Sequence, residues 1–272
     1  MMIKASKEVI YGINPVYEVL KKAENRSIYG VYVIEEKRGK EIDRIAELCK
    51  KRKIDLKYVS HNFIEKLLAE ARGQRVVHQG VVALTTSKCY STIDKMLNIA
   101  KSKGGKPLLL ALDGIEDPRN LGAVIRTADA GGVHGIILTR HHTVALTPIV
   151  AKTSAGALEY VAVTVVTNLR ATLSALKKKG LWILGLENTA SQSIYSLDLD
   201  IPLVVVIGGE NTGLRKGIVE ECDFLGNIPM YGHINSLNLS VATGVVIYEI
   251  LNQRLLIGEK TKGKAKKIFK IN

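Results

Sequence analysis

Apolar and polar positions in the first third of the chain alternate between the helical and the extended period. Val16, Val19 and Leu20 share one face of a helix that we predict over residues 12–23. Apolar runs bounded by polar residues predict strands. We expect further elements at 27–34 (strand), 41–51 (helix), 54–59 (strand), 61–71 (helix) and 80–85 (strand). This alternation predicts a small α/β unit of about 80 residues.

A second and longer series of the same kind begins at residue 108. We expect strands at 108–112, 133–138, 161–166, 181–186, 203–208 and 224–229. Helices are expected between and after them, at 121–130, 146–156, 168–179, 213–222 and 237–255. Strands that alternate with helices at this spacing predict a mostly parallel sheet covered on both faces. The intervening segment holds one short amphipathic helix, 92–100, and is expected to be a linker.

The last predicted helix is apolar nearly all the way round its circumference. Its apolar residues are Leu237, Leu239, Val241, Val245, Val246, Ile247, Tyr248, Ile250 and Leu251. A helix with no clear polar side is usually buried. We therefore expect a second protomer, as well as the sheet, to cover this helix.

The composition fits one or two compact domains with real cores, because 46% of the 272 residues are hydrophobic and 24% are charged. The longest apolar runs, such as 108–112 and 203–207, are too short to cross a bilayer, and residues 1–8 lack an apolar signal core. We expect a cytoplasmic protein. The three cysteines, Cys49, Cys89 and Cys222, are widely spaced and favour buried, reduced thiols over disulfides or a zinc site.

The formal net charge of +13 favours a polyanionic partner, with nucleic acid as the leading candidate. Basic residues cluster at 50–53 and 177–179 and in the tail after residue 258. Each run alone is typical of a solvated helix end or a loose tail. Only the basic residues of all these runs taken together point to RNA.

Three short signatures rich in glycine, amide and charged residues follow predicted strands. They read DGIEDPRNLGAVIR at 113–126, IGGENTGL at 207–214 and IPMYGHINSLNLSVA at 228–242. Open α/β sheets bind their ligands at the edge where such strands end. The second signature lacks the ending of a phosphate-binding P-loop, and no dinucleotide-binding glycine pattern follows the first strand. Neither ATP nor a dinucleotide is indicated.

In this order and spacing the signatures resemble motifs one, two and three of the SpoU class of RNA ribose 2′-O-methyltransferases, which are TrmH-like members of the SPOUT superfamily. The likeness covers about residues 108 to 256. It implies an α/β fold with a trefoil knot, whereas the general rule against threaded loops predicts an unknotted doubly wound domain. It also implies a homodimer.

The N-terminal segment resembles the RNA-substrate domain of SpoU-class rRNA methyltransferases, whose fold is like that of ribosomal protein L30e. The resemblance rests on residues 9–20 and 78–83. It implies an L30e-like RNA-binding domain at 1–86, a linker at 87–106, a methyltransferase domain at 107–257 and a basic tail at 258–272. This layout most resembles the guanosine-2′-O-methyltransferases of bacterial large-subunit rRNA.

The cofactor that the resemblance implies is S-adenosylmethionine, held mostly by main-chain groups. The matching positions are Gly208, Ile228 and Leu237, with Leu186 at the end of another strand as a weaker addition. A glycine turn after an apolar strand lets the backbone approach a flat ligand closely. Without the resemblance, Ile228 and Leu237 would be read as core residues.

Arg126 matches the catalytic arginine of the family. The apolar stripe of its predicted helix consists of Leu121, Val124, Ile125 and Ala128, so Arg126 projects from the opposite side. The reaction implied is in-line attack of a ribose 2′-hydroxyl on the sulfonium methyl group. A guanidinium ordinarily stays protonated, so we expect Arg126 to stabilise the developing alkoxide or to grip a phosphate. Acceptance of the hydroxyl proton by Arg126 remains the alternative.

Four further residues complete the implied site. Asn120 is expected to organise Arg126 or the ribose, and it could equally cap the motif-one helix. Glu210 could anchor the motif-two loop or orient Arg126. Ser236 and Asn238 are expected to position the target ribose, and Ser236 could also cap the last helix.

A metal site is not expected. His141, His142 and His233 lack spaced carboxylate or cysteine partners. Three alternatives remain open from the sequence: a tRNA ribose methyltransferase, a non-catalytic RNA-binding assembly factor that keeps the fold, and a methyltransferase of an rRNA adenosine. The complete set of five polar site residues argues against the non-catalytic protein.

Overall fold

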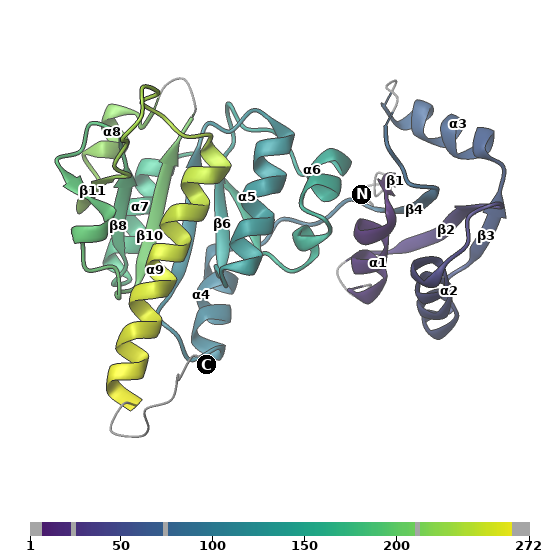
Figure 1. Ribbon diagram of the computed structural model, residues 1–272, viewed down its shortest axis with the longest axis horizontal. Coiled ribbons are helices and arrows are strands. Elements are labelled where there is room, and N and C mark those ends of the chain that lie inside the picture. The colour runs from purple at the N-terminus through teal and green to yellow at the C-terminus, as the bar shows by residue number, and fades with distance from the viewer. Residues whose placement is uncertain (1–6, 23–25, 73–75, 210–212, 263–272) are drawn as a thin grey trace, which may run out of the picture. The chain divides into compact units, whose positions relative to one another are not determined.

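Two compact units make up the chain in the computed structural model, which describes residues 7–22, 26–72, 76–209 and 213–262 (Figure 1). The first unit takes its described residues from 1–91, 116–129 and 144–162. The second takes them from 92–115, 130–143 and 163–272. Packing therefore interleaves segments that are separate in sequence.

A four-stranded sheet forms the centre of the first unit, in the order β1-β4-β2-β3. Its strands are β1 (Lys7–Tyr11), β2 (Ile28–Ile34), β3 (Leu56–Val59) and β4 (Val81–Thr86). The predicted strands are confirmed. We did not predict β1, because its apolar run is short: only Val9, Ile10 and Tyr11 precede Gly12, where φ is +98°.

The first unit contains helices on both sides of this sheet, and further helices that follow later along the chain. They are α1 (Ile13–Lys21), α2 (Lys40–Arg52), α3 (His61–Arg72), α5 (Pro118–Ala130), α6 (Pro148–Thr153) and the short 3-10 helix η2 (Ala157–Glu159). As predicted, α1 buries Val16, Val19 and Leu20. Ile64 and Leu68 of α3 pack against Val9 and Val82. Figure 1 shows α3 on one side of the sheet and α1 and α2 on the other.

A buried arginine joins the four-stranded sheet to the segment 144–162 of the same unit. The side chain of Arg26 is fully buried, and its guanidinium lies 2.7 Å from Glu159 and 2.9 Å from Glu8. The Glu159 side chain is 1% exposed. Buried charges persist only when they are paired and hydrogen-bonded, so this network ties the two segments together.

A seven-stranded sheet forms the centre of the second unit, in the order β7-β6-β5-β10-β8-β11-β9. Its strands are β5 (Leu108–Asp113), β6 (Gly135–Thr139), β7 (Val163–Val166), β8 (Trp182–Leu186), β9 (Gln192–Ser193), β10 (Leu203–Gly208) and β11 (Phe224–Asn227). Every pair in this sheet is parallel, as predicted. Only the two-residue β9 was not predicted.

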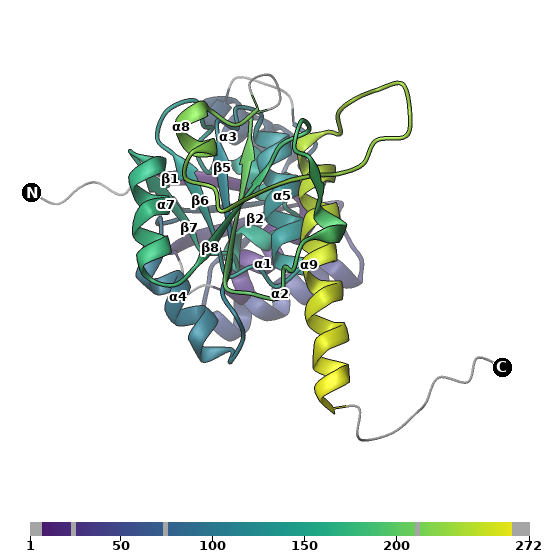
Figure 2. The ribbon, with the colours of Figure 1, turned by 90° about the vertical axis from the view of Figure 1, so that its left-hand side faces the viewer.

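Helices cover both faces of this sheet as well. They are α4 (Ile93–Ser102), α7 (Leu169–Lys178), α8 (Lys216–Val219) and α9 (Leu239–Lys262). Figure 2 shows α4 and α7 on one side of the sheet and α9 on the other. The prediction of a helix over 213–222 was too long. Gly213 has a φ of +58° and forms a bridge with Gly209, and Arg215 is still extended, so the helix begins only at Lys216.

The long helix α9 is apolar on its buried and on its exposed side. Val246, Ile247 and Ile250 are fully buried in the chain. Val241, Tyr248 and Leu255, spaced seven residues apart, are between 51% and 67% exposed. Within the described ranges, no helix combines the length and the apolar character needed to cross a bilayer.

The cysteines are free thiols in different surroundings. Cys49 is buried and Cys222 is half-buried, and burial raises the pKa of each thiol to about 11. Cys89 is exposed, so the prediction of a buried thiol is wrong there. It lies after the end of β4, where the chain leaves the sheet.

Candidate active site at the carboxyl ends of the strands

The carboxyl ends of the central strands meet at one edge of the seven-stranded sheet. Gly208 of β10 is in register with Asp113 of β5, and Ile207 is in register with Leu186 of β8. Leu186 in turn pairs with Gly226 of β11, two residues before Ile228. Three of the four predicted cofactor positions are thus brought to the same edge, where open parallel sheets bind ligands.

Gly208 occupies a position that no larger residue could fill. A Cβ atom at Gly208 would lie 2.1 Å from the main-chain carbon of Gly213, because Gly213 packs directly against the strand end. The Gly213 amide donates to the Gly209 carbonyl at 3.0 Å and closes that loop. Glu210, the predicted acid of motif two, lies outside the described residues.

A buried carboxylate lies beside this loop. Arg215 Nε donates to Asp113 Oδ2 at 2.9 Å, and its Nη2 donates to Asp113 Oδ1. The Asp113 side chain is 1% exposed, and the hydrogen bond to it raises the pKa of Arg215. We had not predicted a role for either residue from the sequence. The sequence feature that could have pointed to this pair is the position of Asp113, an aspartate directly after the apolar run 108–112.

The third motif forms an extended loop from β11 to α9. Ile228 is half-buried, whereas Ser236 and Leu237 are exposed. Leu237 is 37% exposed, so it is not a core residue. Asn188 Nδ2 donates to the carbonyl of Asn235 at 3.2 Å and links this loop to the chain after β8.

Asn238 caps the N-terminus of α9. Its Oδ1 accepts hydrogen bonds from the Ser240 amide at 2.9 Å and from the Ser240 hydroxyl at 2.6 Å. This arrangement satisfies a free amide of the first turn. The expectation that Ser236 caps the helix is wrong, because the helix begins later, at Leu239.

Arg126 projects from the polar side of α5, as predicted. The apolar stripe of the helix is buried, and Arg126 itself is exposed. Asn120 is not the N-cap. The helix already begins at Pro118, where Asp117 Oδ1 accepts from the Arg119 amide at 2.7 Å, which places Asn120 inside the first turn. Arg126 and Asn120 belong to the first compact unit, and the strand-edge residues belong to the second.

One group of metal-ligand type occurs among the described residues, away from the histidines singled out in the sequence. Ligand atoms of His61, Glu65 and His78 lie within 4.8 Å of one another. His78 Nδ1 accepts from the Gly80 amide at 3.1 Å, so in the neutral ring the proton is on Nε2. Nε2 lies 3.1 Å from Glu65 and can donate to it. In this tautomer neither ring nitrogen of His78 has a free lone pair that could bind a metal.

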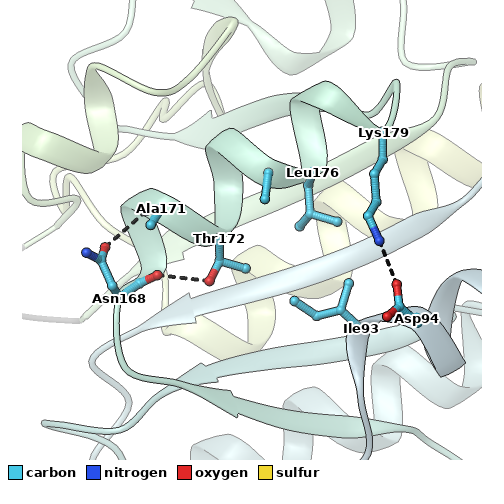
Figure 3. Close-up of a pocket in the computed structure, with 8 residues that line it drawn as sticks. Ile93, Asp94, Asn168, Ala171, Thr172, Leu176 and Lys179 are labelled. Carbon is cyan, nitrogen blue, oxygen red and sulfur yellow. Dashed lines mark hydrogen bonds and ion pairs between the residues drawn. The ribbon is translucent and has the colours of Figure 1, made fainter.

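A cavity of about 480 Å³ between α4 and α7 contains none of the predicted site residues (Figure 3). Asp94 and Lys179 form an ion pair across it at 2.6 Å. Asn168 Oδ1 accepts from the Ala171 amide at 3.0 Å and caps α7. These polar groups bind one another or the backbone of the fold, and the strand edge remains the candidate site.

Comparison with known families gives matches to both parts of the chain. Residues 107–248 match the SpoU rRNA Methylase family. Residues 9–91 match a family described as RNA 2′-O ribose methyltransferase substrate binding.

Individual relatives extend over almost the whole chain. YacO of Bacillus subtilis (strain 168), named as a TrmH-family tRNA/rRNA methyltransferase, is 38% identical over 93% of this chain and 98% of its own length. The crystal structure of an RNA 2′-O ribose methyltransferase is 25% identical, with a TM-score of 0.75 over 92% of this chain and 90% of the other. AviRb from Streptomyces viridochromogenes, a SpoU methyltransferase solved in complex with AdoMet, shares the fold at 22% identity, with a TM-score of 0.76 over 93% and 92%. The chain belongs to the SpoU family of RNA methyltransferases.

Proposed function

We propose that this protein transfers a methyl group from S-adenosylmethionine to the 2′-hydroxyl of a ribose in bacterial large-subunit rRNA, with guanosine as the target nucleoside. The observation that carries the proposal is the register of Asp113, Gly208 and Leu186, which gathers motif residues at the ligand-binding edge of a family-matched domain. Membership of the SpoU family supplies the reaction class.

The cofactor is held by Gly208, Ile228 and Leu237, with Leu186 beside them. The strand edge fits a flat ligand, because Gly208 carries no side chain and Leu186 and Ile228 are half-buried apolar residues. When bound, S-adenosylmethionine supplies a methyl carbon activated by its positive sulfur. The residues around it need only align the acceptor oxygen with that carbon.

Arg126 stabilises the negative charge that develops on the ribose oxygen as its proton leaves. Its side chain is exposed, and a guanidinium suits charge stabilisation better than proton acceptance. Asn120 and Glu210 orient Arg126, and Ser236 and Asn238 position the ribose. Asn238 also caps α9 through its side-chain oxygen, which fixes the position of this residue at the start of the helix.

We assign residues 1–86 to RNA binding, 87–106 to the linker, 107–257 to catalysis and 258–272 to a basic tail. The family matches at 9–91 and 107–248 support the two domains. The N-terminal domain, proposed to be L30e-like, is the reason to prefer rRNA over tRNA. The net charge of +13 supports a polyanionic substrate and gives no information on its sequence.

We also propose a cytoplasmic homodimer that contacts through α9, with a trefoil knot in the methyltransferase domain. The exposed apolar stripe Val241, Tyr248 and Leu255 supports the dimer, because seven-residue spacing keeps one helix face toward a partner. The cytoplasm is where bacterial RNA substrates are found.

The test is transfer of tritiated methyl groups from S-adenosylmethionine to unmodified rRNA and tRNA transcripts. We expect label in rRNA and its loss by at least about a hundredfold in Arg126→Ala. Arg170→Ala, which removes an exposed arginine outside the motifs, is the control for charge. Label in tRNA alone would identify a tRNA enzyme. RNA binding without transfer to any transcript would identify an assembly factor.

A further inference from the structure

Several cations of the first compact unit are held against tyrosine rings, outside the site described above. We call this the α1–α2 basic surface and define it by six residues: Tyr17, Lys21, Lys22, Arg44, Arg52 and Tyr160. They come from α1 and its C-terminus, from α2, and from the residue that follows η2. All belong to one unit.

The two rings arrange the cations around them. The Arg44 guanidinium lies 4.7 Å from the Tyr17 ring centre, and its Nη2 donates to the Tyr17 hydroxyl at 2.9 Å. Lys21 Nζ lies 5.5 Å from the Tyr17 ring and 5.9 Å from the Tyr160 ring. Lys22 Nζ lies 5.3 Å from the Tyr160 ring. Each contact is within cation–π range.

The C-terminal ends of α1 and α2 extend the surface. The Arg52 guanidinium donates to the carbonyl of Lys21, which brings the two helix ends together. The last turn of α2 adds Lys50 and Lys51, both exposed. Glu18 lies 3.3 Å from Lys21, and its carboxylate accepts a hydrogen bond from the Tyr160 hydroxyl. The lysine and arginine side chains named for this surface outnumber this carboxylate.

These contacts differ from those of a solvated basic helix end, because long lysine and arginine side chains are normally disordered. Holding such a side chain in one place costs conformational entropy. Ring contacts that already restrict these side chains lower the cost of binding a phosphate. Cations already cover parts of the Tyr17 and Tyr160 ring faces. Stacking of unpaired RNA bases on these rings is therefore not the favoured mode of binding.

We propose that the α1–α2 basic surface binds phosphates of the structured RNA substrate, without reading its bases. The inference rests on the proposed function and specifies which face of the N-terminal domain holds the RNA. Phosphate contacts fix the position of a protein on a helix and carry no sequence information. Structured RNA presents such phosphates in regular rows.

The test is the salt dependence of RNA binding, measured by fluorescence anisotropy with a labelled, unmodified large-subunit rRNA transcript. The variant is Lys21→Ala/Lys22→Ala/Arg44→Ala. We expect at least about tenfold weaker binding at low salt, and a plot of log affinity against log salt whose slope is shallower by about two to three. Tyr160→Leu keeps every charge and should weaken binding by about two- to fivefold.

The matched control is Lys95→Ala/Lys101→Ala/Lys103→Ala, which removes three exposed lysines of α4 and its C-cap in the other unit. Unchanged affinity and slope in the surface variant, or an equal loss in the control, would overturn the proposal. Methyl transfer is measured separately on the wild type. Wild type that binds RNA through this surface and transfers no methyl group would overturn the proposed function alone.

Discussion

Arg215 and Asp113, which lie 102 positions apart in sequence, form a two-pronged ion pair at the end of β5. Asp113 is in register with Gly208, and Arg215 follows the motif-two loop directly. The pair therefore anchors the C-terminal end of that loop to the strand edge. The ion pair thereby holds the backbone beside the proposed cofactor site in one position.

Arg215→Ala should destabilise the fold by roughly 2 kcal/mol and weaken S-adenosylmethionine binding. The substitution leaves the Asp113 carboxylate buried without its partner, which costs about 3–5 kcal/mol in a fully buried pair and less here, because Arg215 is 60% exposed. Urea unfolding and isothermal titration with S-adenosylmethionine measure the two effects. Arg215→Lys should recover only part of each, since lysine cannot bind in two-pronged geometry. Unchanged unfolding and titration curves would refute the anchoring role.

Gly208→Ala should lower S-adenosylmethionine affinity at least about tenfold. The new methyl group would lie 2.1 Å from main-chain atoms of Gly213, so the loop has to move, at a cost of about 1–3 kcal/mol in stability. Gly105→Ala is the control, because a Cβ there meets nothing within 4 Å. Titration with the cofactor decides the matter, and equal affinities in the two variants would contradict a tight loop at Gly208.

Tyr248→Glu should convert the proposed homodimer to a monomer at micromolar concentration. Tyr248 is 55% exposed in the single chain, so the substitution costs little in a monomer, whereas a dimer through this face would bury an unpaired charge at a cost of several kcal/mol. Sedimentation equilibrium gives the masses. Tyr58→Glu makes the same change at an exposed tyrosine of β3 and should leave the dimer intact. A dimeric Tyr248→Glu protein would exclude this face.

Stability should fall as the pH drops below about 6.5, with His134 as one cause. His134 Nδ1 accepts from the Leu108 amide at 3.1 Å, and burial, as the largest cause, lowers the pKa of the ring. The unfolded chain then binds a proton at higher pH than the folded one, so the free energy of unfolding decreases from the ordinary histidine pKa down to the lowered value. Urea unfolding between pH 5 and 8 should show that the free energy of unfolding depends less steeply on pH in His134→Gln than in the wild type. The size of the difference depends on how far the histidine pKa is lowered in the folded protein. Parallel curves for variant and wild type would exclude His134.

Sequence patterns predicted those parts of the fold that depend on local order. The strands 108–112 and 203–208 were found because each is an unbroken apolar run, and Arg126 was placed correctly by helical periodicity. The start of α8 was misplaced, because the bridge between Gly209 and Gly213 replaces helical hydrogen bonds. The partnership of Asp113 with Arg215 could not be predicted, since it depends on which strands become neighbours in the sheet.

The buried pair of Arg26 and Glu159 limits how this protein could have been assembled from interchangeable modules. Arg26 precedes β2, and Glu159 belongs to η2, far along the chain in the family-matched methyltransferase region. A lineage that lost or exchanged the N-terminal domain would remove the ion pair between Arg26 and Glu159. We therefore expect an exchanged domain to be tolerated better when the residue at position 159 is changed with it.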